Sequence, residues 1–188
     1  EGSSVKCDKD IRVVLGQSHD ASLSLVSSFL PNIQPGDNGT TTLTVTNQGN
    51  GVDTFKLSSS SPPQGWSVQL SKSSITLGSK HGNERSGDVE VTVNVPQNAL
   101  ADDQVNIVLS VLSNNGGITF AEITLSVTVA AYHAMEIEST TSDQTGRSDT
   151  EVRFPISIEN QGNVEDTFRC AVMSQTATPN WGTSFEDA

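Results

Sequence analysis

The chain has 188 residues and a mass of 19.9 kDa, enough for one large domain or two small ones. It carries 22 acidic residues against 10 basic ones, a formal net charge of −12 at pH 7. Nucleic acids and anionic membranes bind clustered Lys and Arg, so this charge argues against both as main partners. No run of 18 apolar residues is present, and the sequence therefore predicts no membrane insertion.

Apolar and polar residues alternate with period 2 in several short runs, which predicts β-strands with one buried and one solvated face. The inward positions of the four clearest runs are Leu43 and Val45; Val89, Val91, Val93 and Val95; Val105, Ile107, Leu109 and Val111; and Ile123, Leu125, Val127 and Val129. No stretch shows the spacing i, i+3, i+4 and i+7 that indicates an amphipathic helix. We therefore expect an all-β chain.

Clusters of Gly, Pro and Asn separate these runs and predict tight turns, because Gly and Asn tolerate positive φ and Pro fixes it. The clusters occupy residues 34–39, 47–51, 62–65, 96–98 and 114–117. Asn115-Gly116, between two alternating runs, is the strongest hairpin signal. Seven or eight short strands at this spacing favour an antiparallel β-sandwich of two sheets.

An internal repeat with an offset of 113 residues is visible in the sequence. Residues 47–55 (NQGNGVDTF) recur as residues 160–168 (NQGNVEDTF), and Trp66 aligns with Trp181 after a two-residue insertion. The inward parity of the apolar residues is kept throughout the aligned stretch. We therefore expect tandem repeats rather than one large domain.

The N-terminal residues follow the same repeat, because Ile11, Val13 and Leu15 match by pattern Ile123, Leu125 and Val127. Three parts are expected. They are residues 1–19, the final strand of a preceding repeat or an N-terminal extension; residues 20–130, a complete sandwich; and residues 131–188, the first half of a second repeat. The half repeat lacks strands that would cover its core, so excision from a longer repetitive protein is expected over completion by a neighbouring molecule.

Several short motifs follow one another in a fixed order. They are Pro35-Gly36-Asp37, residues 43–50 (LTVTNQGN), Asp53-Thr54-Phe55, Gly65-Trp66-Ser67-Val68, the run from Val89 to Val95, and Pro96 with Ala99 and Ala101. This order resembles the Ig-like domain beside carbohydrate-binding modules in some α-galactosidases, with its relatives in cell-adhesion-related domains and archaeal S-layer-type repeats. The resemblance implies tandem Ig-like β-sandwich repeats of an exported protein, used as spacer, scaffold or adhesive element. It carries no catalytic residues onto this sequence.

The two cysteines, Cys7 and Cys170, lie at inward-parity strand positions on either side of the complete repeat. A sandwich of this size is roughly 35–40 Å long, whereas the Cα atoms of a disulfide lie about 5.5 Å apart. In repeats strung end to end, these cysteines therefore cannot pair within one chain. We expect two small buried hydrophobic side chains. A disulfide between molecules, or to further repeats of a parent protein, is the alternative.

Acidic side chains are the main candidates for metal binding. Calcium takes oxygen ligands from loops, and Asp20, Asp53, Asp102 and Asp103 lie near repeat ends or turns. No Asp-x-Asp-x-Asp-Gly loop is present, so we expect no cofactor and keep calcium at these aspartates as an alternative. The histidines, at positions 19, 81 and 133, are isolated along the sequence and are expected to be solvated surface groups.

Tryptophan can stack on a bound sugar, and asparagine can carry a glycan. Trp66 and Trp181 each begin an alternating run, which places the indoles on the core side rather than on a sugar-binding surface. Asn38-Gly39-Thr40 is the only Asn-x-Ser/Thr sequon, and it falls in a predicted turn. Asn38 is therefore a candidate for glycosylation in a secreted protein.

The sequence holds no nucleophile elbow, phosphate-binding loop or Cys-x-x-Cys motif. We therefore expect a non-enzymatic structural or adhesive module of a secreted or cell-surface repeat protein. Its expected partners are neighbouring repeats of the same or an identical chain. Two alternatives stay open: a glycan- or calcium-binding accessory module of a larger extracellular hydrolase, with surface glycans as partners, and a subunit of a head-to-tail extracellular fibre.

Overall fold

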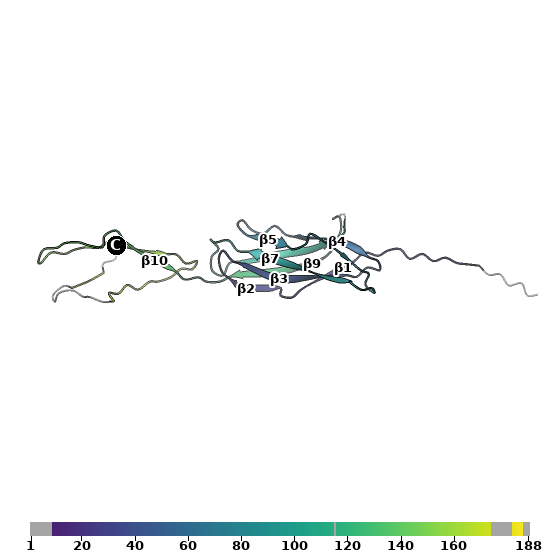
Figure 1. Cartoon of the computed structure of the whole chain (residues 1–188), viewed down its shortest axis with the longest axis horizontal. Coiled ribbons are helices and arrows are strands. Elements are labelled where there is room, and N and C mark those ends of the chain that lie inside the picture. The colour runs from purple at the N-terminus through teal and green to yellow at the C-terminus, as the bar shows by residue number, and fades with distance from the viewer. Residues whose placement is uncertain (1–8, 115, 174–181, 186–188) are drawn as a thin grey trace, which may run out of the picture. The chain divides into compact units, whose positions relative to one another are not determined.

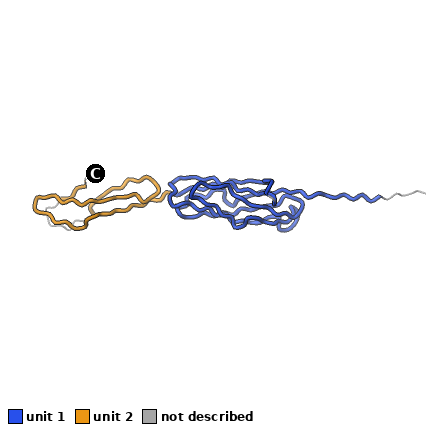
Figure 2. Tube along the Cα trace, turned by 90° about the horizontal axis from the view of Figure 1, so that it is seen from above, with its two compact units in different colours: residues 1–130 blue, residues 131–188 orange. Residues whose placement is uncertain are grey.

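The fold is that of a computed structural model, which describes residues 9–114, 116–173 and 182–185. These residues form β-strands and no helix, and so contain no helix that could span a membrane. The chain divides into two compact units, residues 1–130 and 131–188 (Figure 2). The all-β prediction is confirmed for the described residues.

Unit 1 is a sandwich of two β-sheets (Figure 1). The four-stranded sheet has the order β1 (Ala21–Leu25), β3 (Asn38–Asn47), β7 (Ser86–Asn94) and β5 (Ser67–Leu70). The five-stranded sheet has the order β2 (Phe29–Ile33), β9 (Thr119–Val129), β8 (Gln104–Leu112), β4 (Asp53–Ser59) and β6 (Ser74–Leu77). Neighbouring strands are antiparallel except β2 and β9, which run parallel.

The parallel pair differs from the antiparallel sandwich that the sequence predicts, and its cause is the crossing between β1 and β2. Residues 26–28 carry the chain from one sheet to the other without reversing it, and the Thr41 hydroxyl donates to the Ser27 carbonyl there at 2.9 Å. β1 starts opposite Asn47, and β2 ends at Ile33, which lies against Gly39 beside Asn38, the first residue of β3. We name the two ends of the sandwich the Asn47 end and the Asn38 end.

The core of unit 1 lies between the sheets and uses the inward positions of the alternating runs. Side chains that are at most 1% exposed include Leu43, Val45, Val89, Val91, Val93, Ile107, Leu109, Val111, Leu125, Val127 and Val129. The buried ring of Phe55 meets Phe120 edge to face, with ring centroids 5.8 Å apart. Trp66 is partly buried and packs against this core, on the side that the sequence predicts. Trp181 lies outside the described residues.

The predicted turns join these strands. Gly36 and Gly65 have φ of 83° and 88°, a conformation in which a side chain would be strained. The hairpin between β8 and β9 is formed, with Gly116 at φ 73°, although Asn115 of its turn lies outside the described residues. The clusters of Gly, Pro and Asn therefore predict where these strands end.

Unit 2 contains one antiparallel pair of strands, β10 (Met135–Ser139) and β11 (Ile156–Asn160). Met135 stands opposite Asn160 as Ala21 stands opposite Asn47 in unit 1. All ten residues of β10 and β11 are exposed, because no second sheet covers this pair in the described part of unit 2.

The N-terminal segment has no partner strand in the described part of the chain. Residues 9–20 form no strand, and Ile11, Val13 and Leu15 are 81%, 78% and 85% exposed. A strand needs a neighbour to satisfy its backbone N–H and C=O groups. No strand of the described chain pairs with this segment, and residues 9–16 extend away from the sandwich (Figure 1).

Candidate functional site

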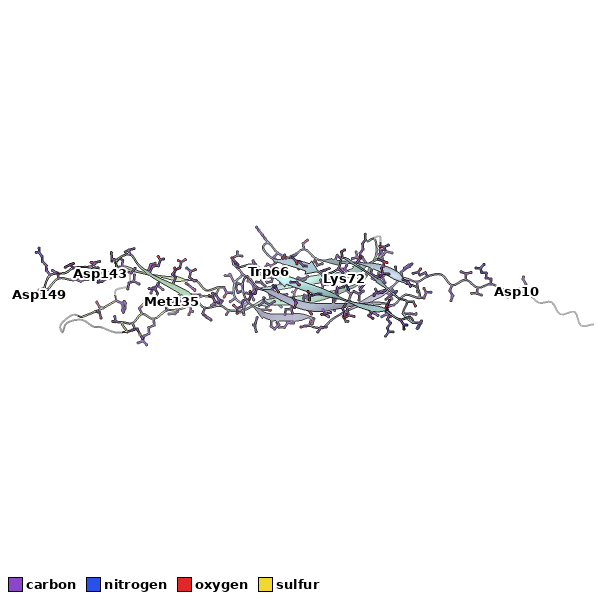
Figure 3. The ribbon with its side chains drawn as sticks, in the orientation of Figure 1. Asp10, Trp66, Lys72, Met135, Asp143 and Asp149 are labelled. Carbon is purple, nitrogen blue, oxygen red and sulfur yellow. The ribbon has the colours of Figure 1, made fainter. Side chains whose placement is uncertain are left out.

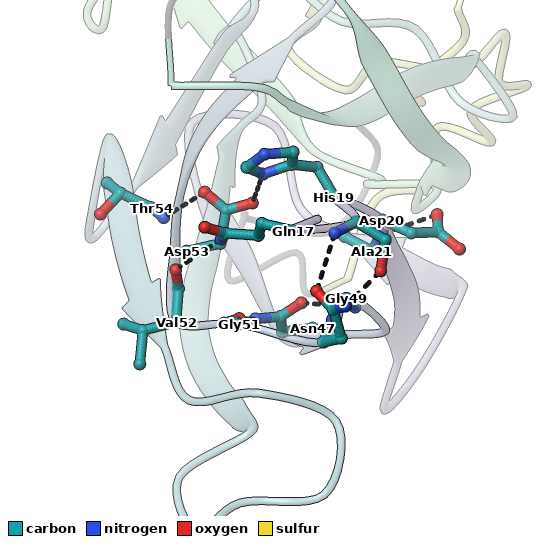
Figure 4. Close-up of polar contacts among 12 residues, drawn as sticks. Gln17, His19, Asp20, Ala21, Asn47, Gly49, Gly51, Val52, Asp53 and Thr54 are labelled. Atoms are coloured by element: carbon teal, nitrogen blue, oxygen red, sulfur yellow. Dashed lines mark hydrogen bonds and ion pairs between the residues drawn. The ribbon is translucent and has the colours of Figure 1, made fainter. Parts of the chain in front are cut away.

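Residues 16–20, which lead into β1, are held by the loop between β3 and β4 at the Asn47 end (Figure 4). The Ser18 N–H donates to Asn50 Oδ1 at 2.7 Å, and Asn50 Nδ2 donates to the Gly16 carbonyl at 2.9 Å. The side chain of Gln17 adds a hydrogen bond to the backbone of the same loop. We call this set of contacts the clasp of unit 1.

A histidine–aspartate pair completes the clasp. His19 Nδ1 and Asp53 Oδ2 lie 2.6 Å apart, and Asp53 Oδ1 accepts the Thr54 N–H at 2.8 Å. The Asp53 side chain is 14% exposed and that of His19 is 51% exposed. The carboxylate therefore connects the incoming segment to the first residues of β4.

The shape of the loop follows from Asn47, whose side chain is fully buried. Its Oδ1 accepts the Gly49 N–H at 2.7 Å, a local turn that Asn favours. Its Nδ2 donates to the carbonyls of Gly51 and Gly78, both at 2.9 Å. Gly49 is required here, since a Cβ would overlap the Ser18 carbonyl oxygen. The NQGNG sequence thus shapes the loop that binds the segment leading into β1.

The same contacts recur at the start of unit 2. The Tyr132 N–H donates to Asn163 Oδ1 at 2.6 Å, and His133 Nδ1 lies 2.9 Å from Asp166 Oδ2. The hydrogen bond with His133, followed by that from the Thr167 N–H, holds the pKa of the Asp166 carboxyl below its ordinary value of 3.8. We call this set the clasp of unit 2.

The two clasps correspond residue by residue. Ser18, His19, Asn50 and Asp53 match Tyr132, His133, Asn163 and Asp166. Asn160 repeats Asn47, because it accepts the Gly162 N–H at 2.9 Å and donates to the Val164 carbonyl at 2.8 Å. The entering residues are 114 positions apart and the loop residues 113.

Two of the three histidines are therefore paired in space, although the sequence predicts isolated groups. His19 and His133 each have an aspartate partner, although both stay at least half exposed. The signal that could have found them is the repeat itself, since histidines recur at nearly the offset of Asp53 and Asp166. Pairs this exposed contribute little to stability.

The aspartates named as calcium candidates fall into two groups. Asp20 and Asp53 lie at the Asn47 end, whereas Asp102 and Asp103 lie at the Asn38 end, where the Asp103 carboxylate accepts the Leu100 N–H at 2.9 Å. Across the described residues, no three His, Cys, Asp or Glu side chains gather where they could hold a metal ion.

The remaining candidates were a disulfide and a glycosylation site. Cys7 lies outside the described residues. Cys170 is exposed, contrary to the buried position expected, because no described strand of unit 2 covers its side. Asn38 is exposed and is the first residue of β3 rather than a turn residue.

Unit 2 has an apolar pocket over the uncovered side of β10 and β11 (Met135 is labelled in Figure 3). Its lining includes Met135, Ile137, Ile156, Ile158, Phe168 and Cys170, which we call the open face. In register, Ile156 and Ile158 match Leu43 and Val45 of unit 1. The isoleucines are 51% and 36% exposed, whereas Leu43 and Val45 are at most 1% exposed.

Comparison with known families supports the resemblance drawn from the sequence. Residues 33–112 match the family described as the NPCBM-associated, NEW3 domain of alpha-galactosidase. This stretch lies within unit 1, runs from the end of β2 to the end of β8, and contains the motifs that carry the resemblance. A comparison with curated proteins gives no match. The resemblance drawn from the sequence is thus confirmed for this stretch of unit 1.

Several solved structures are similar to the chain at low identity. One is a family 123 glycoside hydrolase from Clostridium perfringens, with 11% identity over 58% of this chain and 27% of that one, at a TM-score of 0.44. Another is the SrpA adhesin (R347E mutant) from Streptococcus sanguinis, with 13% identity over 60% and 58% of the chains, at 0.39. A third is the surface layer protein SbsC, domains 1-6, with 13% identity over 77% and 22%, at 0.38. At these identities the similarity assigns no function to this chain.

Proposed function

We propose that the chain is a non-enzymatic structural module, in which tandem Ig-like repeats space or display other parts of a secreted or cell-surface protein. The observation that carries this proposal is the clasp, built from the same atoms at the start of both units. A repeat relation between the units accounts for the near-constant offset and for the shared register of the two strand pairs. Unit 2 is, in this interpretation, the beginning of a second sandwich.

The connection between the units is short, which suits a spacer. The Ala130 N–H donates to the Ile33 carbonyl in unit 1, and the Tyr132 N–H donates to Asn163 in unit 2. Only Ala131 lies between these two fixed residues.

The surface chemistry supports an exported role. The net charge of −12 keeps an extended β-protein soluble and discourages exposed strand edges from pairing with other molecules. Outward positions of β3 carry threonines rather than apolar residues. The match of residues 33–112 to a domain associated with a hydrolase supports an accessory role in the same setting.

The spacer role is tested by nuclear spin relaxation of the amides in the full chain. We expect both units to report one rotational correlation time, because Ala131 alone connects them. A variant with Gly-Ser-Gly-Ser inserted after Ala131 is the control and should give a separate, shorter time for unit 2. Independent tumbling of the two units in the native chain would contradict the spacer proposal.

The competing role is recognition of calcium or glycans, and it is tested separately. We expect the thermal unfolding midpoint of unit 1 to be the same in millimolar calcium and in chelator, and a glycan array to show no binding. A calcium-dependent rise in the midpoint that Asp53→Asn removes would favour the binding module instead. The same loss with Asp103→Asn would place the calcium site at the Asn38 end instead.

A further inference from the structure

The side chain of Asn50 has two opposite hydrogen-bonding roles in the clasp of unit 1. Its Oδ1 accepts the Ser18 N–H at 2.7 Å, and its Nδ2 donates to the Gly16 carbonyl at 2.9 Å. A side-chain amide offers both a donor and an acceptor, whereas an ionised carboxylate is an acceptor alone. The contact with Gly16 therefore depends on Asn50 keeping its amide nitrogen.

The residue after Asn50 is Gly51, whose backbone nitrogen is open to reaction. Glycine has no Cβ, so no side chain of its own shields this nitrogen. Within the described chain, the Gly51 N–H donates to no acceptor, because the recorded contact of Gly51 is made by its carbonyl. Asn50 itself is exposed to solvent. A backbone nitrogen and water thus both have access to the Asn50 amide.

This setting differs from that of another asparagine that precedes a glycine. Such pairs begin at positions 38, 50 and 115 of the sequence. Asn115 lies outside the described residues. Gly39 lies in β3 with the same parity as Asn47, whose N–H donates to the Arg85 carbonyl, so the Gly39 nitrogen belongs to the ladder between β3 and β7. The Gly39 nitrogen is therefore held within a sheet, and the Gly51 nitrogen is not.

Unit 2 has the equivalent asparagine with a different residue after it. Asn163 accepts the Tyr132 N–H at 2.6 Å, as Asn50 accepts the Ser18 N–H. The next residue is Val164, whose branched side chain crowds the backbone nitrogen beside it. Attack of a backbone nitrogen on the side-chain amide is therefore expected in the clasp of unit 1 and not in that of unit 2.

We propose that Asn50 is a site of spontaneous deamidation, and that this modification opens the clasp of unit 1. The Gly51 nitrogen forms a bond to Cγ of Asn50 while the Cγ–Nδ2 bond breaks, and Nδ2 leaves as ammonia with the proton from the Gly51 nitrogen. Water then opens the cyclic imide at either carbonyl carbon, which leaves aspartate or isoaspartate. Water is the co-reactant, and no oxidant or reductant takes part.

The product does not restore the clasp. In aspartate, a carboxylate oxygen replaces Nδ2 and faces the Gly16 carbonyl oxygen, so two acceptors meet where a donor and an acceptor stood. Isoaspartate also lengthens the backbone before Gly51, which moves the side chain away from Ser18. The opening is therefore irreversible. The inference concerns the clasp itself and does not rest on the spacer role proposed above.

The test is incubation of the full, folded chain at neutral pH in water enriched in heavy oxygen. Peptide mapping by mass spectrometry then locates each side-chain amide that has become a labelled acid. We expect Asn50 to convert about tenfold faster than Asn163, or more, because Gly51 leaves its nitrogen unshielded and Val164 does not. Equal rates at the two asparagines, or conversion of Asn50 only when urea unfolds unit 1, would overturn the proposal.

A matched control variant reproduces the pair of residues that unit 2 has at these positions. Gln17 and Gly51 correspond to Ala131 and Val164 at the offsets of 114 and 113 residues. A Cβ on residue 51 would lie 2.8 Å from Gln17 Cδ, so Gly51→Val is combined with Gln17→Ala (Gln17 and Gly51 are labelled in Figure 4). In this double variant Asn50 should keep its amide. Deamidation at the native rate would show that Gly51 is not the attacking group.

A second measurement follows the clasp after the reaction. We expect hydrogen exchange at Ser18 to be faster in the deamidated fraction of the aged chain than in its intact fraction. Asn50→Asp, which supplies one of the two products directly, should show the same increase while the amides of β3 stay protected. Unchanged protection of Ser18 in both samples would show that the clasp survives the modification, and would overturn this part of the proposal. Calcium, glycans and the motion of the units enter neither measurement, so this inference fails separately from the proposed function.

Discussion

Units 1 and 2 begin with the same strand pair and the same clasp, and they differ in what lies above that pair. In unit 1 a five-stranded sheet covers Leu43 and Val45, whereas in unit 2 the matching Ile156 and Ile158 stay exposed. The hydrogen bonds of the clasp are nevertheless of similar length in both units. The pairing of the first two strands and the clasp thus form without a covering sheet, whereas burial depends on strands further along the sequence.

The difference also separates two sources of stability. Burying an aliphatic side chain contributes about 1.5–3 kcal/mol, while an exposed ion pair contributes about 0–1 kcal/mol. Unit 1 has many such buried side chains, and the described part of unit 2 has the clasp and one strand pair. Unit 2 should therefore be the first to open, and matched substitutions in the two units can measure the contrast.

The largest contrast is expected from the two phenylalanines at equivalent positions. Phe55 is fully buried against Phe120, so Phe55→Ala should lower the free energy of unfolding of unit 1 by about 3–5 kcal/mol. Phe168 is only half buried, and Phe168→Ala should cost less than about 1 kcal/mol. Urea unfolding followed by amide resonances resolves the two units. Equal losses would show that the open face is covered in solution.

A smaller contrast is expected from the asparagines that shape the clasp loops. Asn47→Ala removes a buried side chain that satisfies Gly49, Gly51 and Gly78, and should destabilise unit 1 by about 2–3 kcal/mol. Asn160→Ala removes similar bonds at an exposed position, where water replaces them, and should cost less than about 1 kcal/mol. The same urea experiment measures both. A larger loss from Asn160→Ala would reverse the comparison.

The glycines test the feature that the units share. A Cβ at Gly49 would overlap the Ser18 carbonyl, and one at Gly162 would overlap the Tyr132 carbonyl. Each Gly→Ala change should open its own clasp at a cost of about 1–2 kcal/mol, seen as faster hydrogen exchange at Ser18 or Tyr132. Gly16→Ala is the control, since no atom lies within 4 Å of a Cβ there. Unchanged exchange in both variants would mean that the clasps do not hold in solution.

The smallest effect is expected from pH. The pKa of Asp166 is lowered by its hydrogen bonds with His133 and the Thr167 N–H. A carboxyl whose pKa is lower when folded stabilises the fold above its unfolded pKa, and this contribution disappears as the pH falls through the folded value. The clasp of unit 2 should thus hold near neutral pH and loosen below about pH 4. The Thr167 amide shift reports this change, and Asp166→Asn should abolish it.

The strands could be predicted from the sequence because alternation is local. The apolar residues expected to point inward from β3, β7 and β8 are buried, since a period of two puts every second side chain on one face. The pairing of strands could not be predicted in the same way. β5 and β6 are separated by three residues yet join different sheets, and no local pattern specifies which neighbour a strand takes.

The clasp of unit 1 likewise has one part that the sequence predicts and one part that depends on the fold. The turn around Asn47 is encoded in five consecutive residues, and its recurrence around Asn160 is readable without a structure. The meeting of His19 with Asp53 joins residues 34 positions apart, so it depends on the register between β1 and β3. The sequence alone therefore predicts solvated histidines and does not reveal the aspartate partners of His19 and His133.

By itself, the sequence determined the all-β class, the positions of most strands and the similarity between residues 47–55 and 160–168. These features depend on the alternation of neighbouring residues or on direct similarity between segments. Only the tertiary structure decided that residues 11–15 remain unpaired, that Cys170 is exposed and that β2 runs parallel to β9. The physical reason is that apolar alternation specifies which side of a segment should be buried. What buries it depends on which other strands are within reach.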